Sequence, residues 1–245
     1  MSFKTKLRSF YTLFLILPAF LFAQQSPEVP APHTDRWPLV VNLAQKQMGN
    51  DLRLFTGVEY IRNGQHAQGH PFFRSDQPLD GALWYDGAWY DHVSLQFDLV
   101  TGEVVTFDGA GGPGISLLKE KLPRFVLEDR PFLRVPIAGD SDRSITSGYY
   151  ELLADGACTL LARHEKRLVF PSSKEDSVKY VATEGYFIRL SGRYIRIEGK
   201  RSLLNALADK KDALKKMIRQ HDLNFNKDLE NALIQSINYY TQLKN

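Results

Sequence analysis

The sequence contains a single cysteine, Cys158. One cysteine cannot close an intrachain disulfide, and it cannot supply the set of thiolates that a Cys-based structural zinc site requires. In an oxidising compartment a lone thiol is safest when buried, and Cys158 lies in an apolar stretch. His164 follows six residues later, but this spacing alone does not pair a base with the thiol. We therefore expect Cys158 to be a core residue rather than a nucleophile.

Catalytic and cofactor-binding signatures are also missing. The sequence has neither a Gly-x-Ser-x-Gly nucleophile elbow nor a His-Glu-x-x-His metal motif. The glycine-rich residues 108–114 lack the Lys-Ser/Thr of a phosphate-binding loop, and Pro113 offers no N–H donor. His66 and His70 would share a face only on a helix, which Gly69 disfavours. We therefore assign no catalytic, cofactor-binding or metal-ligating residue.

The apolar run Phe10–Phe22 is shorter than the roughly 20 residues that a membrane-spanning helix needs. It follows three basic residues and is broken by Pro18, a pattern typical of a cleaved secretory signal. We predict a signal peptide over residues 1–23, with cleavage before Gln24; the alternative is an uncleaved anchor. No cysteine follows the apolar core. We therefore expect a periplasmic or secreted protein that is not lipid-anchored and has no transmembrane segment in its mature chain.

A surplus of positive charge is lacking once this signal is set aside. Residues 1–23 hold three of the 31 Lys and Arg residues and none of the 28 Asp and Glu residues. The remaining chain therefore has a formal net charge of zero. Because nucleic-acid binding needs clustered Lys and Arg facing phosphates, we expect no nucleic-acid partner.

Composition divides the mature chain into three parts. Residues 24–38 contain four prolines and few apolar side chains, which predicts a disordered leader. Residues 39–199 read as a β-rich domain, and residues 200–245 as a helical hairpin packed on the sheet. Four turn dipeptides punctuate the β-rich part: Asn63-Gly64, Asp86-Gly87, Asp155-Gly156 and Ser191-Gly192. Such turns join sequential antiparallel strands. We predict an α+β fold, a mainly antiparallel β-meander curled or closed into a partial barrel.

The segment Gly148–Lys166 organises this prediction. Asp155-Gly156 suits a two-residue type I′ turn, in which both central residues have φ above zero. That turn would pair Ala154 with Ala157 and Tyr150 with Leu161. Both faces of the resulting hairpin are mostly apolar, so we expect other parts of the chain to cover each side. The amphipathic C-terminal segment is the candidate cover.

Ala88–Asp98 alternates apolar and polar residues with a period of two, which predicts a half-buried strand. In such a strand Asp91 and His92 point to opposite faces and cannot act together. At Ser202 the apolar period becomes helical, with Ser202 as the predicted N-cap of one helix and Asp228 as the N-cap of a second. This pair is the predicted helical hairpin.

Two sets of side chains are candidates for function. Glu151 lies on a largely apolar hairpin face, where burial would raise the pKa of a carboxyl unless it has a partner. We expect a structural partner such as a tyrosine or an arginine. The alternative is a hydrolase that uses scattered acids such as Glu151, Asp91 and Asp98, two of which would have to lie within about 5–10 Å of each other.

Aromatic side chains gather around one turn, and exposed aromatics line many sugar- and peptide-binding surfaces. Core packing explains most clusters of this kind. The candidate ligand-binding residues are Trp84, Tyr85, Trp89 and Tyr90.

Several features together resemble a group of uncharacterised secreted proteins of Bacteroidetes-type bacteria. These are a signal that ends in Phe-Ala-Gln, the run Gly-Tyr-Tyr-Glu at 148–151, a late tyrosine-rich hairpin, and the helical run from Ser-Leu-Leu at 202–204 to Tyr-Tyr at 239–240. The resemblance implies a location in or beyond a Gram-negative envelope. It implies no activity and no site residues.

The sequence therefore favours an exported, non-enzymatic module that binds an envelope or extracellular ligand. Two alternatives stay open: a hydrolase of unrecognised type, and a carrier of a lipid or other apolar ligand inside a half-barrel. The carrier would need an internal apolar cavity of a few hundred Å³.

Overall fold

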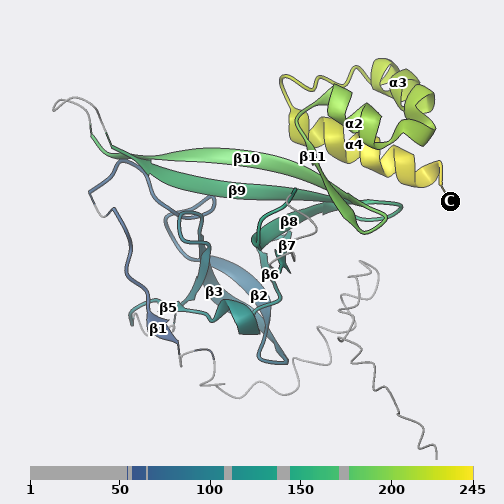
Figure 1. Ribbon diagram of the computed structural model, residues 1–245. Helices are drawn as coiled ribbons and strands as arrows, with labels where there is room; N and C mark the ends of the chain where they lie inside the picture. Colours follow the sequence, from purple (N-terminus) through teal and green to yellow (C-terminus); the bar gives the residue numbers. More distant parts are fainter. Residues whose placement is uncertain are drawn as a thin grey trace, which may run out of the picture. The chain divides into compact units, whose positions relative to one another are not determined.

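The computed structural model describes residue 54 and residues 57–64, 66–107, 112–136, 144–170 and 177–244. The predicted signal peptide and proline-rich leader lie outside these residues. The described part is a mainly antiparallel sheet with three α-helices near its C-terminal end, which confirms the predicted α+β class (Figure 1).

Eleven strands form one open sheet in the described residues, and every strand pair in it is antiparallel. Their order across the sheet is β1-β5-β4-β3-β2-β6-β7-β8-β9-β10-β11. The strands are β1 (Val58–Glu59), β2 (Leu79–Tyr85), β3 (Ala88–Asp98), β4 (Glu103–Thr106), β5 (Ile115–Ser116), β6 (Arg124–Leu127), β7 (Arg130–Val135), β8 (Gly148–Ala154), β9 (Thr159–Val169), β10 (Lys179–Leu190) and β11 (Arg193–Ile197).

The sheet is two meanders rather than one. From β2 the chain adds β3, β4 and β5 in one direction, and it then returns to place β6 on the other side of β2. From β6 to β11 each strand pairs with the next. Short turns explain the pairs β2–β3, β3–β4, β6–β7, β8–β9 and β10–β11, because a short turn leaves the next strand no place except beside its predecessor.

Two of the predicted hairpin turns are confirmed. Asp86 and Gly87 have φ of 50° and 83°, and Ser191 and Gly192 have φ of 49° and 79°. Both pairs connect strands that face each other without a gap, as type I′ turns require. Asn63-Gly64 joins no strand pair, so the hairpin predicted there is wrong. That loop instead packs against Tyr180, whose hydroxyl donates to the carbonyl of Asn63.

The predicted register of the β8–β9 hairpin is wrong by two residues. Leu161 pairs with Leu152 rather than with Tyr150, and a bulge near Ala154 precedes the turn. Gly156 does not have a positive φ. It is required for another reason: a Cβ at Gly156 would lie 2.5 Å from Cγ2 of Thr241 in the C-terminal helix. Up to the bulge, an even shift keeps the side chains on their predicted faces, so both faces are still apolar.

A bulge also interrupts β3, the strand that was predicted to alternate regularly. The β2–β3 register slips between Gly81 and Leu83, and His92 opposite has φ of 53°. The extra residue changes the phase of the strand. Tyr90 and Leu95 therefore share one core, although strict alternation puts them on opposite faces.

The C-terminal segment contains three α-helices instead of the predicted two: α2 (Lys200–Ala206), α3 (Lys211–Gln220) and α4 (Leu229–Gln242). Asp228 is the N-cap of α4, as predicted, and its carboxylate accepts from the N–H of Asn231 at 3.1 Å. Ser202 lies inside α2, whose N-cap position is Gly199; the Ser202 hydroxyl accepts from the Gly199 N–H.

The helices cover one face of β8–β11 and share a core with it (Figure 1). Leu160, Ala162 and Ile188 contribute from the strands to this core, and Leu214, Leu233 and Ile237 contribute from the helices, all at 0% exposure. Tyr150, Leu161 and Phe187 form a separate cluster on the other face. The predicted cover on both faces of the organising hairpin is confirmed.

A segment that we call the strap, residues 66–76, joins distant strands. Its backbone bonds to β10 through Gln68, whose carbonyl accepts from the N–H of Tyr180. Phe73 bonds to the end of β3 through a hydrogen bond from its N–H to the carbonyl of Phe97. The strap thereby crosses from the outer end of β9–β10 to the end of β3.

Candidate functional site

The candidate site lies on the face of β9–β10 that carries the helices, just beyond the part they cover. Residues two apart on a strand share a face, so His164 and Lys166 follow Ala162 on this face of β9. On β10, Ala182 pairs with Lys166 and Glu184 pairs with His164. The face therefore changes from apolar to charged within one pleat, a step of roughly 6.6 Å.

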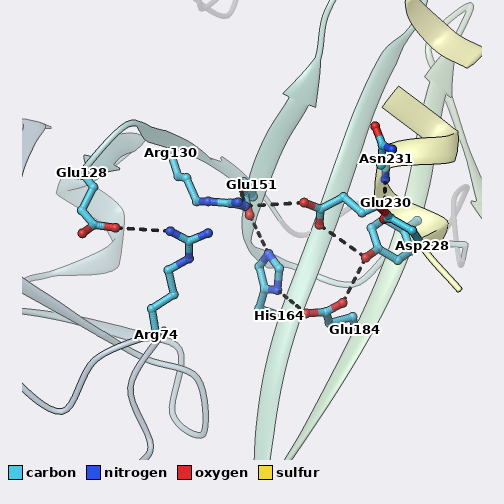
Figure 2. A network of polar contacts seen from close by, with 10 residues as sticks. Arg74, Glu128, Arg130, Glu151, His164, Glu184, Asp228, Glu230 and Asn231 are labelled. Atoms are coloured by element: carbon cyan, nitrogen blue, oxygen red, sulfur yellow. Dashed lines mark hydrogen bonds and ion pairs between the residues drawn. The ribbon is translucent and has the colours of Figure 1, made fainter. Parts of the chain in front are cut away.

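Glu151 is the most buried charged group of the site. Its side chain is 3% exposed. Arg130 of β7 donates to one carboxylate oxygen at 2.5 Å, and His164 Nε2 lies 2.7 Å from the other (Figure 2). An arginine partner for Glu151 is confirmed, and His164 is a second partner that the sequence analysis missed. Burial without these partners would be costly, because an isolated carboxylate loses its hydration.

His164 lies between two carboxylates. Nδ1 of the ring is 3.5 Å from Glu184 Oε1, on the side opposite to Glu151. A doubly protonated imidazole can donate to both groups at once. The rings of Phe73 and Phe132 lie 5.0 and 6.4 Å from the imidazole and restrict its orientation.

Helix α4 adds a carboxylate from a distant part of the chain. Glu230 lies in its first turn, 3.7 Å from Arg130, and accepts a 3.4 Å hydrogen bond from the Tyr186 hydroxyl (Figure 2). Tyr186 also donates to Glu184 at 3.0 Å. Burial, together with these carboxylates, raises the pKa of Tyr186. Burial lowers the pKa of Arg130, but Glu151 and then Glu230 outweigh it, so the net change is upward.

Arg130, His164, Glu184 and Glu230 line a pocket of about 270 Å³, while Glu151 and Tyr186 lie behind them. It lies where the strap, β7, β9–β10 and α4 meet. A volume just below the usual range for drug-sized ligands suits a small molecule. The lining residues are Phe73, Arg74, Leu99, Arg130, His164, Glu165, Lys166, Ala182, Thr183, Glu184 and Glu230.

Lys166 and Arg74 form the strap end of this pocket. The Lys166 ammonium donates to the carbonyls of His70 and Phe72 at 2.9 and 2.7 Å. Burial lowers the pKa of Lys166, although the Asp76 and Asp98 carboxylates oppose the change. Arg74 is half exposed and lies 3.4 Å from Glu128 (Figure 2). Its guanidinium lies 5.7 Å from the centre of the Phe73 ring.

The aromatic candidates lie elsewhere and do not line the pocket. Tyr85, Trp89 and Tyr90 are buried, and only Trp84 keeps part of its ring exposed, with Arg124 stacked 5.4 Å from its centre. Burial leaves three of these residues no surface to offer a ligand in this conformation. A binding role for the four stays a prediction, with Trp84 as its accessible member.

The three acids proposed for a hydrolase make different contacts. Asp98 is fully buried and accepts from the Tyr60 hydroxyl at 2.6 Å and the N–H of Val100 at 2.7 Å. Asp91 accepts from the N–H of His92 within the bulge. Glu151 contacts Arg130 and His164, and these two residues link it to Glu230 and Glu184.

Cys158 is confirmed as a core residue, and burial raises the pKa of its thiol to about 11. Within the described residues, no cluster of three or more His, Cys, Asp or Glu side chains is arranged to hold a metal ion. None of the helices described has the length and apolar character to cross a bilayer. Comparisons with protein-family models, curated proteins and solved structures found no match for this chain.

Proposed function

We propose that this chain is an exported binding module, and that its ligand site is the pocket between the strap, β9–β10 and α4. One observation carries the proposal: charged side chains from four separate segments converge on a single small pocket, and other contacts fix most of them. Fixed polar groups around a concave, partly apolar pocket are the usual form of a small-molecule site. The predicted signal peptide supports export.

Binding is favoured over catalysis by the state of His164. Both ring nitrogens face carboxylates of the chain itself, at 2.7 and 3.5 Å. A general base must have a nitrogen free to reach the proton that it abstracts. In this conformation His164 therefore acts as a structural group that fixes the pocket wall.

A hydrolase is the second candidate, and one observation favours it. Glu184 is 54% exposed and its contact with His164 Nδ1 is long. If Glu184 turns outward, Nδ1 faces the pocket while Glu151 still orients the ring through Nε2. That pair would suit general-base activation of a water molecule. The carrier alternative is less well supported, because charged side chains line the pocket, whereas a lipid would require an apolar cavity in a partial barrel.

Native mass spectrometry of the mature protein, purified from its own envelope fraction, tests the proposal. We expect a small polar molecule to remain bound to the wild type. In Ala182→Trp an indole ring fills the pocket and should abolish this adduct. Val181→Trp is the matched control, because Val181 precedes Ala182 on β10 and points to the other face. A bare wild-type chain, or an adduct that survives Ala182→Trp, contradicts the proposed site.

A further inference from the structure

The charges of the pocket are unevenly compensated. Glu165 pairs with Arg163 at 2.7 Å. Glu184 and Glu230 share the single proton of the Tyr186 hydroxyl, at 3.0 and 3.4 Å, and each faces a basic side chain. The lining acids are therefore all engaged within the protein.

Lys166 differs from every other charged residue that lines the pocket. No carboxylate of the described residues lies within ion-pair distance of its ammonium, which is held by two backbone carbonyls. An ammonium has three N–H donors, so the two carbonyls leave one donor for a further acceptor. The cation is thus fixed in position and partly desolvated, and the Asp76 and Asp98 carboxylates act on it only from beyond ion-pair distance.

Arg74 occupies a backbone conformation that does not suit an arginine. Its φ is 55°, in the left-handed region where glycine, asparagine and aspartate are favoured. The chain nevertheless places an arginine here, beside the ring of Phe73 and at the rim of the pocket. A guanidinium carries five N–H donors, and Glu128 meets only one of its nitrogens among the described contacts.

The same end of the pocket has an apolar floor. Phe73 and Leu99 are 6% and 7% exposed, and both line the pocket next to Lys166. Two cationic donors above an apolar surface match a ligand that has an oxyanion attached to a short apolar body.

We propose that Lys166 and Arg74 bind the oxyanion, a carboxylate or a phosphate, of a small ligand whose apolar part rests on Phe73 and Leu99. This inference rests on the proposed function, because it names the chemistry of the ligand in the same pocket. It also gives the positive φ of Arg74 a physical reason: the strain places a guanidinium opposite the Lys166 ammonium across the ligand.

Four probes of similar size test the inference: benzoate, phenyl phosphate, neutral benzyl alcohol and cationic benzylamine. Each is titrated into the mature protein at constant ionic strength, and binding is followed through the NMR signals of the His164 ring, which forms part of the pocket wall. We expect at least one of the two anions to bind at least about tenfold more tightly than benzyl alcohol and benzylamine, the factor that one charge-assisted hydrogen bond supplies. Tighter binding of phenyl phosphate identifies a phosphate ligand, and tighter binding of benzoate identifies a carboxylate.

Two variants locate the anion. Lys166→Met replaces the lysine with an uncharged side chain of similar length. Arg74→Gly removes the guanidinium, and glycine adopts the positive φ of this position without strain. Each should weaken binding of the preferred anion by about tenfold or more. Arg167→Met is the matched control, because Arg167 is the next residue on β9, is exposed, and faces the other side; it should bind as the wild type does. Thermal melting of each variant confirms that it is folded.

The inference is overturned if benzyl alcohol or benzylamine binds as tightly as the anions, or if Arg74→Gly and a folded Lys166→Met keep wild-type affinity. Charge-independent binding that shifts the His164 signals would leave the proposed pocket standing and remove only the oxyanion. Absence of binding by all four probes also overturns the inference, whereas the proposed function is judged separately by the adduct seen in native mass spectrometry.

Discussion

Glu151 gives the sharpest test of how the site is held together. Glu151→Gln preserves the size of a side chain that is 3% exposed, but it removes the negative charge between Arg130 and His164. A hydrogen bond to a charged group contributes about 1.5–3 kcal/mol, and breaking a buried ion pair by removing one partner costs about 3–5 kcal/mol. Because Gln keeps one acceptor and Arg130 retains Glu230, we expect a loss of about 2–3 kcal/mol in the free energy of unfolding.

Glu165→Gln is the matched control. This residue also contacts an arginine, Arg163, at 2.7 Å, but its side chain is 52% exposed. An exposed ion pair contributes less than about 1 kcal/mol, so this variant should be nearly as stable as the wild type. Urea unfolding monitored by circular dichroism measures the free energy of unfolding of both variants, and equal m-values show that the two can be compared directly. If Glu151→Gln costs no more than Glu165→Gln, the buried network does not stabilise the site.

Four further predictions concern Gly156, Arg74 and Cys158. Gly156→Ala should lower the free energy of unfolding by about 1–3 kcal/mol, because the new Cβ overlaps Thr241; adding Thr241→Ala should restore part of the loss, and no rescue would contradict the close approach. Arg74→Gly should change stability by less than about 1 kcal/mol, since relief of the positive φ offsets the lost contacts with Glu128 and Phe73; a larger loss in urea unfolding would show that Arg74 is structural. Cys158 should react with thiol reagents at pH 8 at least about a hundredfold more slowly when folded than in denaturant, since its pKa is about 11. The pKa of this thiol is higher in the folded state than in the unfolded state, so between pH 9 and 11 the thiol ionises mainly in the unfolded state. Over this range the free energy of unfolding of the wild type should fall by up to roughly 3 kcal/mol relative to that of Cys158→Ala. Parallel pH profiles of the two proteins would contradict this.

Features set by neighbouring residues were predictable from the sequence. Asp86-Gly87 and Ser191-Gly192 form the turns expected of them, because the preference for positive φ is local to each pair. Strand Ala88–Asp98 has the predicted bounds. The helical period after residue 200 also indicated the helices that cover the sheet.

Features set by distant residues were not predictable. The register of the β8–β9 hairpin depends on a bulge and on contact between Gly156 and Thr241, which are far apart in the chain. The bulge at His92 leaves no mark in the hydrophobic pattern, because Trp89 and Tyr90 before it are both apolar and the alternation therefore reads the same in either phase. The chain also forms two helices, α2 and α3, where a single helical pattern predicted one.

The same distinction applies to the site. The apolar surroundings of Glu151 correctly indicated a buried acid in need of a partner. Its actual partners come from β7 and β9, and Glu230 arrives from α4, so only the tertiary fold brings them together. One local signal was available: His164 and Lys166 continue, two residues at a time, a strand face that is otherwise apolar. A change from apolar to charged residues along one face marks the place where the cover of the sheet ends.

The decisive experiment is a crystal structure of the mature protein, purified from its own envelope without added ligand. We expect density for a small molecule in the pocket between the strap and α4, with an oxyanion against Lys166 and Arg74. Density over the exposed edge of Trp84, with this pocket filled only by water, would refute the proposed site and favour the aromatic surface instead.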